Sequence, residues 1–295
     1  MESKTQELVI LKNHPLKEYT TFRIGGKADF FAEPKTEKEL SDLLAICARE
    51  KIPYYILGHG SNILFTDKGY RGMIIYIAKH FAEIKQDGNF LTVGAGALLK
   101  DVTDYALQRE LEGIVFACGI PGSMGGAVFM NAGAYGGEMK EVVRRVKTMD
   151  SQGEIHEYTG EEMAFGYRQS RVQNTGEIIL EATLELKKGN YAEMKAQTDD
   201  LTQRREEKQP LEMASAGSTF KRPEGFFAGK LIMDAGLSGF SYGDAMVSTK
   251  HCGFVVNKGN ASFSDVMNLV EHIQKTVEEK FQVKMQPEIR IVGER

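Results

Sequence analysis

Apolar residues recur in two patterns along this chain. In the first, the segment TEKELSDLLAICARE at residues 36–50 places its apolar residues three or four positions apart. That spacing predicts an amphipathic helix, and Thr36 followed by Glu39 predicts a capping box at its start. In the second pattern, consecutive apolar and aromatic residues, as in YYIL at 54–57, predict buried strands.

Both patterns continue through the rest of the chain. Further strands are expected in GMIIYI (72–77), FLTV (90–93), EIILEATLELKKG (177–189), HCGFVV (251–256) and EIRIVG (288–293). Residues 141–159 predict a hairpin that turns at Ser151-Gln152-Gly153. Further helices are expected at about 97–111 with Gly113 just past the end, within 190–210 as a linking helix, and at 264–281. This mixture predicts an α+β fold in which residues 1 to about 200 are rich in strands.

The first strand ends in an unusual way, because LGHGSN at 57–62 places two glycines and small polar residues directly after it. In Rossmann and Walker loops a strand passes through glycines directly into a helix. Here the next clear element is the strand at 72–77, so neither loop type fits. The segment VGAGALL (93–99) imitates a dinucleotide fingerprint, but Leu99 stands where the third glycine belongs, so we interpret it as a helix start.

Two glycine-rich segments, 58–62 and 119–126, could hold phosphate. Backbone N–H groups without a neighbouring Cβ can converge on phosphate oxygens as a nest. The alternative is that both are plain structural turns, which are common. Neither segment carries the Gly-Lys-Ser/Thr of a P-loop.

Composition and charge exclude several classes of protein. The 295 residues are 42% apolar and 26% charged, with a net charge of −4, as in ordinary globular proteins, and nothing attracts nucleic acid. No stretch approaches the roughly 18 apolar residues of a membrane span, and the first residues have no signal-peptide core. The three cysteines form no CxxC and no HExxH occurs, so we expect a cytoplasmic protein without membrane insertion, disulfide framework or metal.

Three short polar motifs are candidates for chemistry: FGYRQSR (165–171), AGSTFKRP (216–223) and QPEIR (286–290). In the predicted last strand, Glu288 and Arg290 are two apart and would point to the same face. An arginine, a serine and a glutamate could together bind a carboxylate, donate a proton and stabilise negative charge. The alternative is a surface ion pair and a turn serine.

Six motifs in order resemble the UDP-N-acetylenolpyruvoylglucosamine reductase (MurB) family of bacterial wall synthesis. They are TTFRIGGKADFF, LGHGSNILF, GIPGSMGGAVFMNAGAYGG, GYRQSR, AGSTFKRP and QPEIR. The similarity extends from about Tyr19 to Arg290. It resembles the shorter, second type of the family, because the chain lacks the insertion that brings a tyrosine over the substrate in longer relatives.

The resemblance implies an α+β architecture with the FAD-binding fold of vanillyl-alcohol oxidase and para-cresol methylhydroxylase. That fold would occupy residues 1–200 in two subdomains, roughly 1–80 and 81–200. A smaller α+β substrate-binding domain would occupy residues 201–295 and include the last strand.

The resemblance also implies the activity, which is the NADPH-dependent, FAD-mediated reduction of UDP-N-acetylglucosamine enolpyruvate to UDP-N-acetylmuramate for peptidoglycan. FAD would be bound non-covalently, and the partner would be a small nucleotide sugar; the oligomeric state is left open. Arg168 would stabilise the substrate carboxylate, Ser218 would deliver a proton to C2, and Glu288 would polarise the carboxylate.

The remaining site residues are implied by position in the same motifs. The residues expected to bind FAD are Gly58, His59, Gly60, Ser61, Asn62, Gly119, Ile120, Ser123, Gly125, Gly126, Asn131 and Gly133. The residues expected to bind the substrate are Tyr135, Tyr167, Arg205, Lys208, Lys221 and Arg290.

Two other functions remain open at this point. One is a different flavin oxidoreductase of the same fold acting on a sugar or hydroxy acid. Rapid reoxidation of the reduced flavin by oxygen would favour this alternative. The other is a non-catalytic nucleotide-binding module, which would bind nucleotide without consuming NADPH.

Overall fold

The structure is a computed structural model that describes residues 8–294. The chain forms two compact units. Unit 1 holds the described part of Met1–Lys12 together with Phe30–His59 and Gly72–Arg204. Unit 2 holds Asn13–Asp29, Gly60–Arg71 and Arg205–Arg295. Two short early segments therefore cluster with the C-terminal third, whereas the division into FAD-binding and substrate-binding domains stays a prediction.

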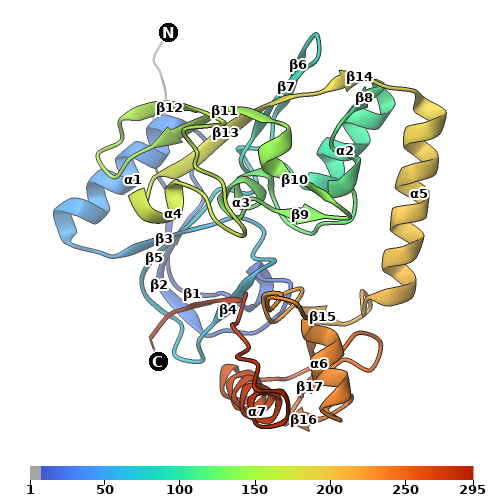
Figure 1. The fold of residues 1–295 in the computed structure, drawn as a ribbon. Coiled ribbons are helices and arrows are strands. Elements are labelled where there is room, and N and C mark those ends of the chain that lie inside the picture. The colour runs from blue at the N-terminus through green and yellow to red at the C-terminus, as the bar shows by residue number, and fades with distance from the viewer. Residues whose placement is uncertain (1–7, 295) are drawn as a thin grey trace, which may run out of the picture. The chain divides into compact units, whose positions relative to one another are not determined.

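Unit 1 contains an antiparallel sheet of five strands (Figure 1). Its order is β12 (Ile155–Thr159), β11 (Val143–Met149), β13 (Ile178–Glu185), β7 (Phe90–Gly94) and β6 (Ile84–Asp87). Buried and more exposed residues alternate along much of these strands, as expected when one face packs on a core and the other faces water. The helix α3 (Met124–Phe129) packs against β13 and β7.

A second sheet has the order β1 (Ile10–Pro15), β2 (Lys27–Ala32), β5 (Tyr70–Tyr76) and β3 (Tyr54–Leu57). Within unit 1, β3 runs parallel to β5, with Tyr54 opposite Met73 and Leu57 opposite Tyr76. The short pairs of this unit are β8 (Leu111–Glu112) with β14 (Lys187–Lys188), and β9 (Gly133–Ala134) with β10 (Gly137–Glu138).

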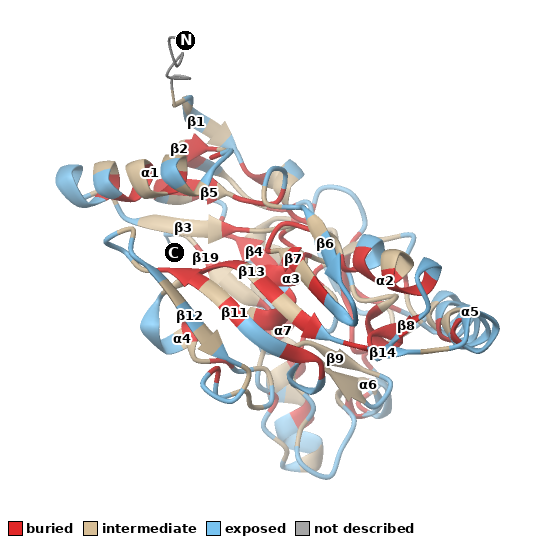
Figure 2. Ribbon diagram, turned by 90° about the horizontal axis from the view of Figure 1, so that it is seen from above, coloured by how far each residue is buried: buried red, intermediate tan, exposed pale blue. Residues whose placement is uncertain are grey.

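One apolar core joins these elements of unit 1. It includes Leu43 of α1 (Glu37–Glu50), Val102 of α2 (Leu99–Gln108), Val128 of α3, Val93 of β7 and Leu184 of β13. In Figure 2, buried residues are coloured red. Each such side chain contributes about 1.5–3 kcal/mol when it is fully buried, so this core is the main source of stability for unit 1.

Helices complete unit 1. They are α4 (Val172–Thr175), α5 (Tyr191–Lys208) and 3₁₀ turns at Val115–Ala117 and Met139–Glu141. The helix α5 is mostly exposed, and only Met194 and Leu201 pack against Leu107 and Val115 in a small separate cluster of buried residues. Its last four residues, from Arg205, belong to unit 2.

Unit 2 is built on an antiparallel sheet with one long helix against it. The strand order is β15 (Ala214–Ser215), β18 (Val255–Asn257), β17 (Ala245–Val247) and β16 (Ser241–Tyr242). The helices are α6 (Ala228–Asp234), α7 (Phe263–Phe281) and a 3₁₀ turn at Lys17–Tyr19. The apolar stripe of α7 packs with Val255, and Phe22 and Leu64 join the same core.

A parallel pair of short strands brings distant segments of unit 2 together. The strand β4 (Ile63–Phe65) pairs with β19 (Arg290–Val292), with Ile63 opposite Arg290. Glu288 precedes this last strand, so the expectation that Glu288 and Arg290 share a strand face is wrong. The strand begins later because Glu288 instead pairs with Thr219, to which its N–H donates at 2.8 Å.

Most other predicted elements are confirmed, including α1, the 151–153 hairpin, the linking helix and α7. The predicted helix at 97–111 ends early, at Gln108. Glu110 has a left-handed backbone (φ 56°), and Leu111–Glu112 leave the helix to pair with Lys187–Lys188. Gly113 is therefore not its cap.

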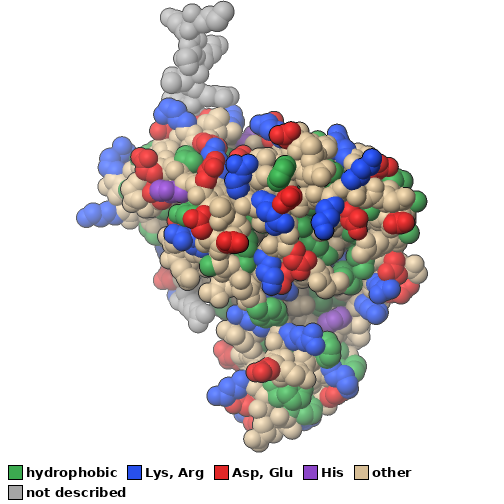
Figure 3. Space-filling model, turned by 45° about the horizontal axis from the view of Figure 1, so that its top comes forward, with side chains coloured by type: hydrophobic (Ala, Val, Ile, Leu, Met, Phe, Trp, Pro, Cys, Tyr) green, Lys and Arg blue, Asp and Glu red, His purple; other side chains and the backbone are tan. Residues whose placement is uncertain are grey.

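The surface charges are mixed. The face drawn in Figure 3 carries interspersed basic and acidic side chains, and several pairs lie four residues apart on helices, such as Lys195 with Asp199. Within residues 8–294, none of the helices combines the length and apolar character needed to cross a bilayer.

Candidate active site

The two glycine-rich segments lie against each other in unit 1. A Cβ on Gly58 would stand 2.6 Å from Oγ of Ser123, so glycine lets the two segments approach without displacing this hydroxyl. His59 Nε2 lies 3.3 Å from the carbonyl oxygen of Gly96, in the turn between β7 and α2. Burial lowers the pKa of His59. The end of β3, the β7–α2 turn and the segment before α3 therefore converge.

The second glycine segment uses several of its own N–H groups internally. Ser123 caps α3 by accepting from the N–H of Gly126 at 3.4 Å. The N–H groups of Met124 and Gly125 donate to the carbonyls of Ala97 and Ala95, each at 2.8 Å. These three N–H groups are already hydrogen-bonded within the protein. The expected phosphate donors are therefore limited to residues 58–62 and to the other residues of segment 119–126.

Space is nevertheless left beside this segment. A Cβ on Gly125 would stand 2.8 Å from the Cβ of Ala95, so this glycine is required by packing. On Gly126 a Cβ would meet nothing nearer than Ser123 Oγ at 3.6 Å. Ile120 packs against the unit 1 core.

Asn131 lies two residues after the end of α3 and is nearly completely buried. Its φ is 40°, a left-handed conformation that asparagine tolerates at a helix end. Its Nδ2 donates to Glu138 Oε2 at 2.6 Å and to the carbonyl of Gly166 at 3.0 Å. Its Oδ1 accepts from the N–H of Lys140 at 2.9 Å. The side chain therefore connects Glu138, Gly166 and Lys140. A contact with FAD stays a prediction. Gly133 lies in β9, where a Cβ would stand 2.7 Å from the carbonyl oxygen of Gly137.

Arg168 lies on a tight turn of unit 1. The N–H and carbonyl groups of Gly166 and Gln169 bond to each other at 3.0 and 3.2 Å across this turn. Arg168 itself is half-buried and has a φ of 56°, which is uncommon for a residue of its size. Its Cζ lies 5.2 Å from the ring centre of Tyr167, and that tyrosine is exposed.

Ser218 and Glu288 are brought together in unit 2. The N–H of Glu288 donates to the carbonyl of Thr219 at 2.8 Å, and the N–H of Lys221 donates to the carbonyl of Gln286 at 2.9 Å. This short antiparallel pairing sets the exposed Ser218 and the half-buried Glu288 in neighbouring segments. Two motifs 70 positions apart in sequence therefore form one structure.

The C-terminal part of the first glycine loop joins the same structure. Asn62 Nδ2 donates to the carbonyl of Glu288 at 3.2 Å, and its own carbonyl accepts from the N–H of Arg290 at 3.0 Å. Gly60 has a φ of 61°, and a Cβ there would collide with the carbonyl oxygen of Tyr19. Ser61 lies between them. Unit 2 thus places Asn62, Ser218, Lys221, Glu288 and Arg290 in connected segments.

His251 supports the serine segment. Its Nδ1 accepts from the N–H of Gly253 at 3.0 Å, and the carbonyl of Gly253 accepts from the N–H of Thr219 at 2.8 Å. Burial lowers the pKa of His251. Thr219 Oγ1 also accepts from the N–H of Val255 at 2.9 Å. Thr219 and Gly253 were missed in the sequence, because backbone pairing leaves no signal in residue type.

The remaining predicted substrate residues lie on or near α5. The hydroxyl of Tyr135 donates to the carbonyl of Leu201 at 3.5 Å, and Tyr135 has a φ of 53°. Arg205 and Lys208 are three apart in the last turn of α5, so they lie on neighbouring positions of one helix side.

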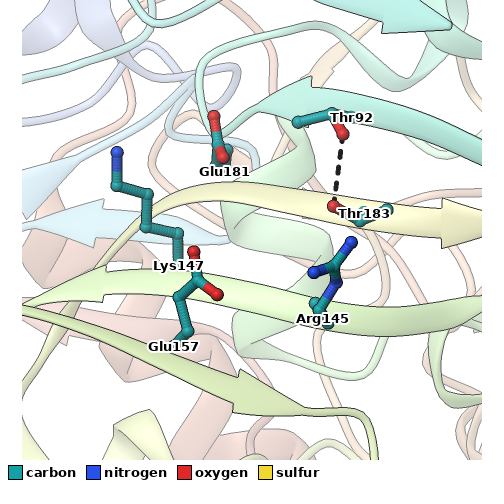
Figure 4. A pocket seen from close by; sticks show the side chains of 6 residues that line it. All are labelled: Thr92, Arg145, Lys147, Glu157, Glu181 and Thr183. Atoms are coloured by element: carbon teal, nitrogen blue, oxygen red, sulfur yellow. Dashed lines mark hydrogen bonds between the residues drawn. The ribbon is translucent and has the colours of Figure 1, made fainter. Parts of the chain in front are cut away.

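A polar depression on the open face of the five-stranded sheet is a weaker candidate (Figure 4). Its lining residues are Thr92, Arg145, Lys147, Glu157, Glu181 and Thr183. Lys147 already pairs with Glu37 at 2.7 Å, and the Thr92 and Thr183 hydroxyls lie 3.2 Å apart. Because cations and carboxylates balance here, we interpret it as the solvated face of the sheet. Over residues 8–294 there is also no cluster of His, Cys, Asp and Glu suited to a metal ion.

Family models match both ends of the chain. Residues 28–159 match the FAD binding domain. Together with the α+β fold, this match places the chain in the class of FAD-containing oxidoreductases. Residues 209–292 match the C-terminal domain of UDP-N-acetylenolpyruvoylglucosamine reductase.

Relatives of similar length match nearly the whole chain. The UDP-N-acetylenolpyruvoylglucosamine reductase of Clostridium perfringens is 52% identical over 284 residues, covering 96% of this chain and 93% of the relative. That of Geobacillus thermodenitrificans is 48% identical over 285 residues, covering 97% and 93%. The crystal structure of the Thermus caldophilus reductase superposes with a TM-score of 0.83 at 35% identity, covering 97% of this chain and 99% of the other. The chain belongs to the UDP-N-acetylenolpyruvoylglucosamine reductase family. The predicted family and FAD-binding fold are confirmed.

Proposed function

We propose that this chain reduces UDP-N-acetylglucosamine enolpyruvate to UDP-N-acetylmuramate with NADPH as the hydride donor, as a step of peptidoglycan synthesis in the cytoplasm. The observation that carries the proposal is the pairing of Thr219 with Glu288. It holds a serine and a carboxylate in neighbouring segments of the region that matches the reductase C-terminal domain. The substrate is then a small nucleotide sugar bound mainly by residues 201–295, and FAD is bound mainly by residues 1–200.

Several features of the glycine segments fit a non-covalently bound FAD. A larger residue at position 58 would clash with the Ser123 hydroxyl, and Gly126 has open space beside it. Residues 58–62 would bind the pyrophosphate, because glycine-rich turns present N–H groups to anions. The residues that would lie along the rest of the cofactor are Gly119, Ile120, Ser123, Gly125, Gly126, Asn131 and Gly133.

When bound, FAD supplies hydride transfer from NADPH to C3 of the enol ether. The chain's own residues then manage the charge and the proton at C2. Arg168 binds the substrate carboxylate and stabilises the negative charge that accumulates there, since a guanidinium can grip both oxygens. Glu288 polarises the same group. Ser218 delivers a proton to C2, which completes addition of hydride and proton across the double bond.

The other predicted substrate residues have roles that follow from charge. Arg205 and Lys208, one helical turn apart, are suited to the diphosphate. Arg290 and Lys221, in the segments that carry Glu288 and Ser218, are suited to the carboxylate and to lowering the proton affinity of Ser218. Tyr135 and Tyr167 both have exposed side chains and would contact the sugar nucleotide.

Replacing Ser218 by alanine tests the proposal. We expect reduction of the flavin by NADPH to be unchanged in Ser218→Ala, because the serine acts only on the second substrate. Reoxidation by UDP-N-acetylglucosamine enolpyruvate should slow by about 10²–10³-fold, the loss typical of one well-aimed transition-state donor. Anaerobic stopped-flow absorbance of the flavin measures both half-reactions.

Ser238→Ala is the matched control, since Ser238 is an exposed serine of the same unit and both half-reactions should be unaffected. Equal loss of both half-reactions in Ser218→Ala would contradict its assigned role. Reoxidation by oxygen alone, with no response of wild-type protein to the enolpyruvyl substrate, would instead favour another flavin oxidoreductase.

A further inference from the structure

Gln173 is not among the residues that the proposed mechanism uses, yet it contacts the turn that carries Arg168. Its Nε2 donates to the carbonyl of Arg168 at 3.0 Å and to the carbonyl of Phe129 at 2.7 Å. Both acceptors are carbonyl oxygens, so the amide must present its nitrogen, and the two N–H groups of that nitrogen match the two acceptors.

Phe129 is the last residue of α3. A carbonyl at a helix C-terminus has no backbone N–H donor within the helix and needs a donor from elsewhere. Ser170, which is buried, donates its hydroxyl to this carbonyl at 2.7 Å, so Gln173 and Ser170 cap the same atom. The end of α3 is thereby bonded to the first and the last residue of the short segment 170–173.

The other arm of the Arg168 turn is held from the same helix end. Asn131 donates to the carbonyl of Gly166 at 3.0 Å, while Gln173 holds the carbonyl of Arg168. The turn is therefore held on each side: by Asn131, which follows α3, and by Gln173 of α4, which also bonds the last carbonyl of α3. These fastenings matter because Arg168 has a φ of 56°, a conformation that is unfavourable for a residue with a Cβ.

The opposite end of α3 begins at Ser123, whose hydroxyl lies against Gly58. The helix is six residues long, about 9 Å at the usual rise per residue. One short rigid element therefore connects the glycine segments with the Arg168 turn.

We infer that Gln173 is a positioning residue that holds Arg168 in its left-handed conformation by bonding the Arg168 carbonyl to the end of α3. The inference rests on the proposed function for the role of Arg168, but the contact itself does not. Fixing the carbonyl fixes the peptide plane after Arg168, and this sets the direction in which the guanidinium leaves the backbone.

The test compares variants that keep or lose the two donors. Gln173→Glu has the same shape but replaces both N–H groups with a charged acceptor that faces two carbonyls. Gln173→Met removes the donors without adding charge. Gln173→Lys keeps N–H donors and should restore the contact. Asn174→Asp is the matched control, because it adds the same charge to an exposed neighbour on the same helix, α4.

We expect reoxidation of the reduced flavin by the enolpyruvyl substrate to slow by about 10–100-fold in Gln173→Glu and Gln173→Met, since misplacing a catalytic group by about 1 Å costs this much. Reduction by NADPH should be unchanged, and Gln173→Lys and Asn174→Asp should behave like wild type. In an Arg168→Ala background, Gln173→Met should have no further effect, because the two residues act through one group.

A crystal structure of Gln173→Met gives a readout that does not depend on activity. Arg168 should leave the left-handed region or the turn should shift away from Phe129. If Arg168 keeps its positive φ and the turn stays in place, the inference is overturned. It is also overturned if reoxidation is unaffected, or if both half-reactions fall together and Gln173→Lys restores neither. Failure of the wild-type protein to react with the enolpyruvyl substrate would refute the proposed function alone, because the crystallographic result would still decide the role of Gln173.

Discussion

Gly58 shows how a single missing side chain shapes the candidate active site. Sequence alone marks it as part of a loop after a strand, but the reason for glycine comes from Ser123, 65 positions later, whose Oγ would stand 2.6 Å from a Cβ at position 58. Real Cβ atoms do not approach other heavy atoms this closely, so a larger residue at position 58 must displace the Ser123 hydroxyl or move one of the two segments.

We therefore expect Gly58→Ala to destabilise the protein by about 1–3 kcal/mol, the usual cost of overpacking a well-packed site. It should also weaken FAD retention, since Gly58 and Ser123 both belong to the segments proposed to bind it. Urea unfolding and the flavin content of the purified protein measure the two effects.

A double-mutant cycle separates the clash from other effects of the alanine. Ser123→Ala alone should cost about 1 kcal/mol, because it removes the cap of α3. Combined with Gly58→Ala it removes the clashing oxygen, so the pair should be less destabilising than the sum of the two single changes. Strict additivity would show that the Gly58 to Ser123 contact is not the reason for glycine at this position.

The sequence could predict the candidate residues that belong to recognisable motifs, such as Ser218 and Glu288. It could not predict the residues that hold them. Thr219 contributes a backbone carbonyl and Gln173 an amide nitrogen to partners that are distant or across a turn, and no spacing rule identifies such partners. The role of each residue in catalysis stays a proposal.

At the scale of elements, the N-terminus of α7 has two independent fastenings. Ser262 and Asp265 form a capping box. Asp67, from the loop after β4, accepts from the N–H groups of Phe263 and Ser264 at 2.8 and 3.2 Å. A carboxylate at this end satisfies unpaired donors and also interacts favourably with the helix dipole.

Replacing Asp67 by alanine should therefore lower the free energy of unfolding by about 1–2 kcal/mol, the range for losing a charged cap. Asp67→Asn should cost less, because the amide oxygen can still accept one of these bonds. Asp199→Ala, which removes an exposed carboxylate paired with Lys195 on α5, should cost about 0.5 kcal/mol or less. Urea unfolding compares the three; equal losses for Asp67→Ala and Asp199→Ala would contradict the capping role.

Long elements were predictable, whereas some of the short ones were not. The apolar stripe of α7 and the hairpin of β11 and β12 follow from periodicity within one segment. The helix α3 and the strand β4 have six and three residues, which is too short for a period to emerge. The predicted end of α2 was wrong because a tertiary interaction replaces the last helical turn. Leu111–Glu112 pair there with Lys187–Lys188.

At the scale of the whole molecule, the resemblance predicted the FAD-binding α+β fold correctly. Periodicity alone would have given only an α+β class. The sequence could not predict which segments make up unit 2. Residues 13–29 and 60–71 belong to it because Phe22, Ile24 and Leu64 pack with residues more than a hundred positions away.

Each unit contains one half-buried histidine whose pKa burial lowers, His59 in unit 1 and His251 in unit 2. A lowered pKa means that the unfolded chain takes up protons more readily than the folded one. These histidines therefore contribute stability above their unfolded pKa of about 6.5, and this contribution is lost as the pH falls through their lower folded pKa.

We expect the free energy of unfolding to decrease as the pH falls from about 7 toward 5, given the unfolded histidine pKa near 6.5. The decrease should be shallower in His251→Asn and His59→Asn. His156 acts in the opposite sense, since its bond with Asp150 raises its pKa, so His156→Asn should steepen the decrease. Urea unfolding at a series of pH values measures all three, and identical profiles for wild type and His251→Asn would contradict the assignment.

The pairing of β4 with β19 has a consequence for how the protein is made. A ribosome releases Phe22, Ile24 and Leu64 early, yet the core that covers them is completed by residues 216–289. The strand β4, which contains Leu64, gains its partner only when residues 290–292 are made. Until translation reaches that point, these apolar side chains lack their native packing partners. Exposed apolar segments of this kind are aggregation-prone and are bound by chaperones. Synthesis of the last strand, Arg290–Val292, is therefore the event that lets the earliest part of unit 2 reach its final state.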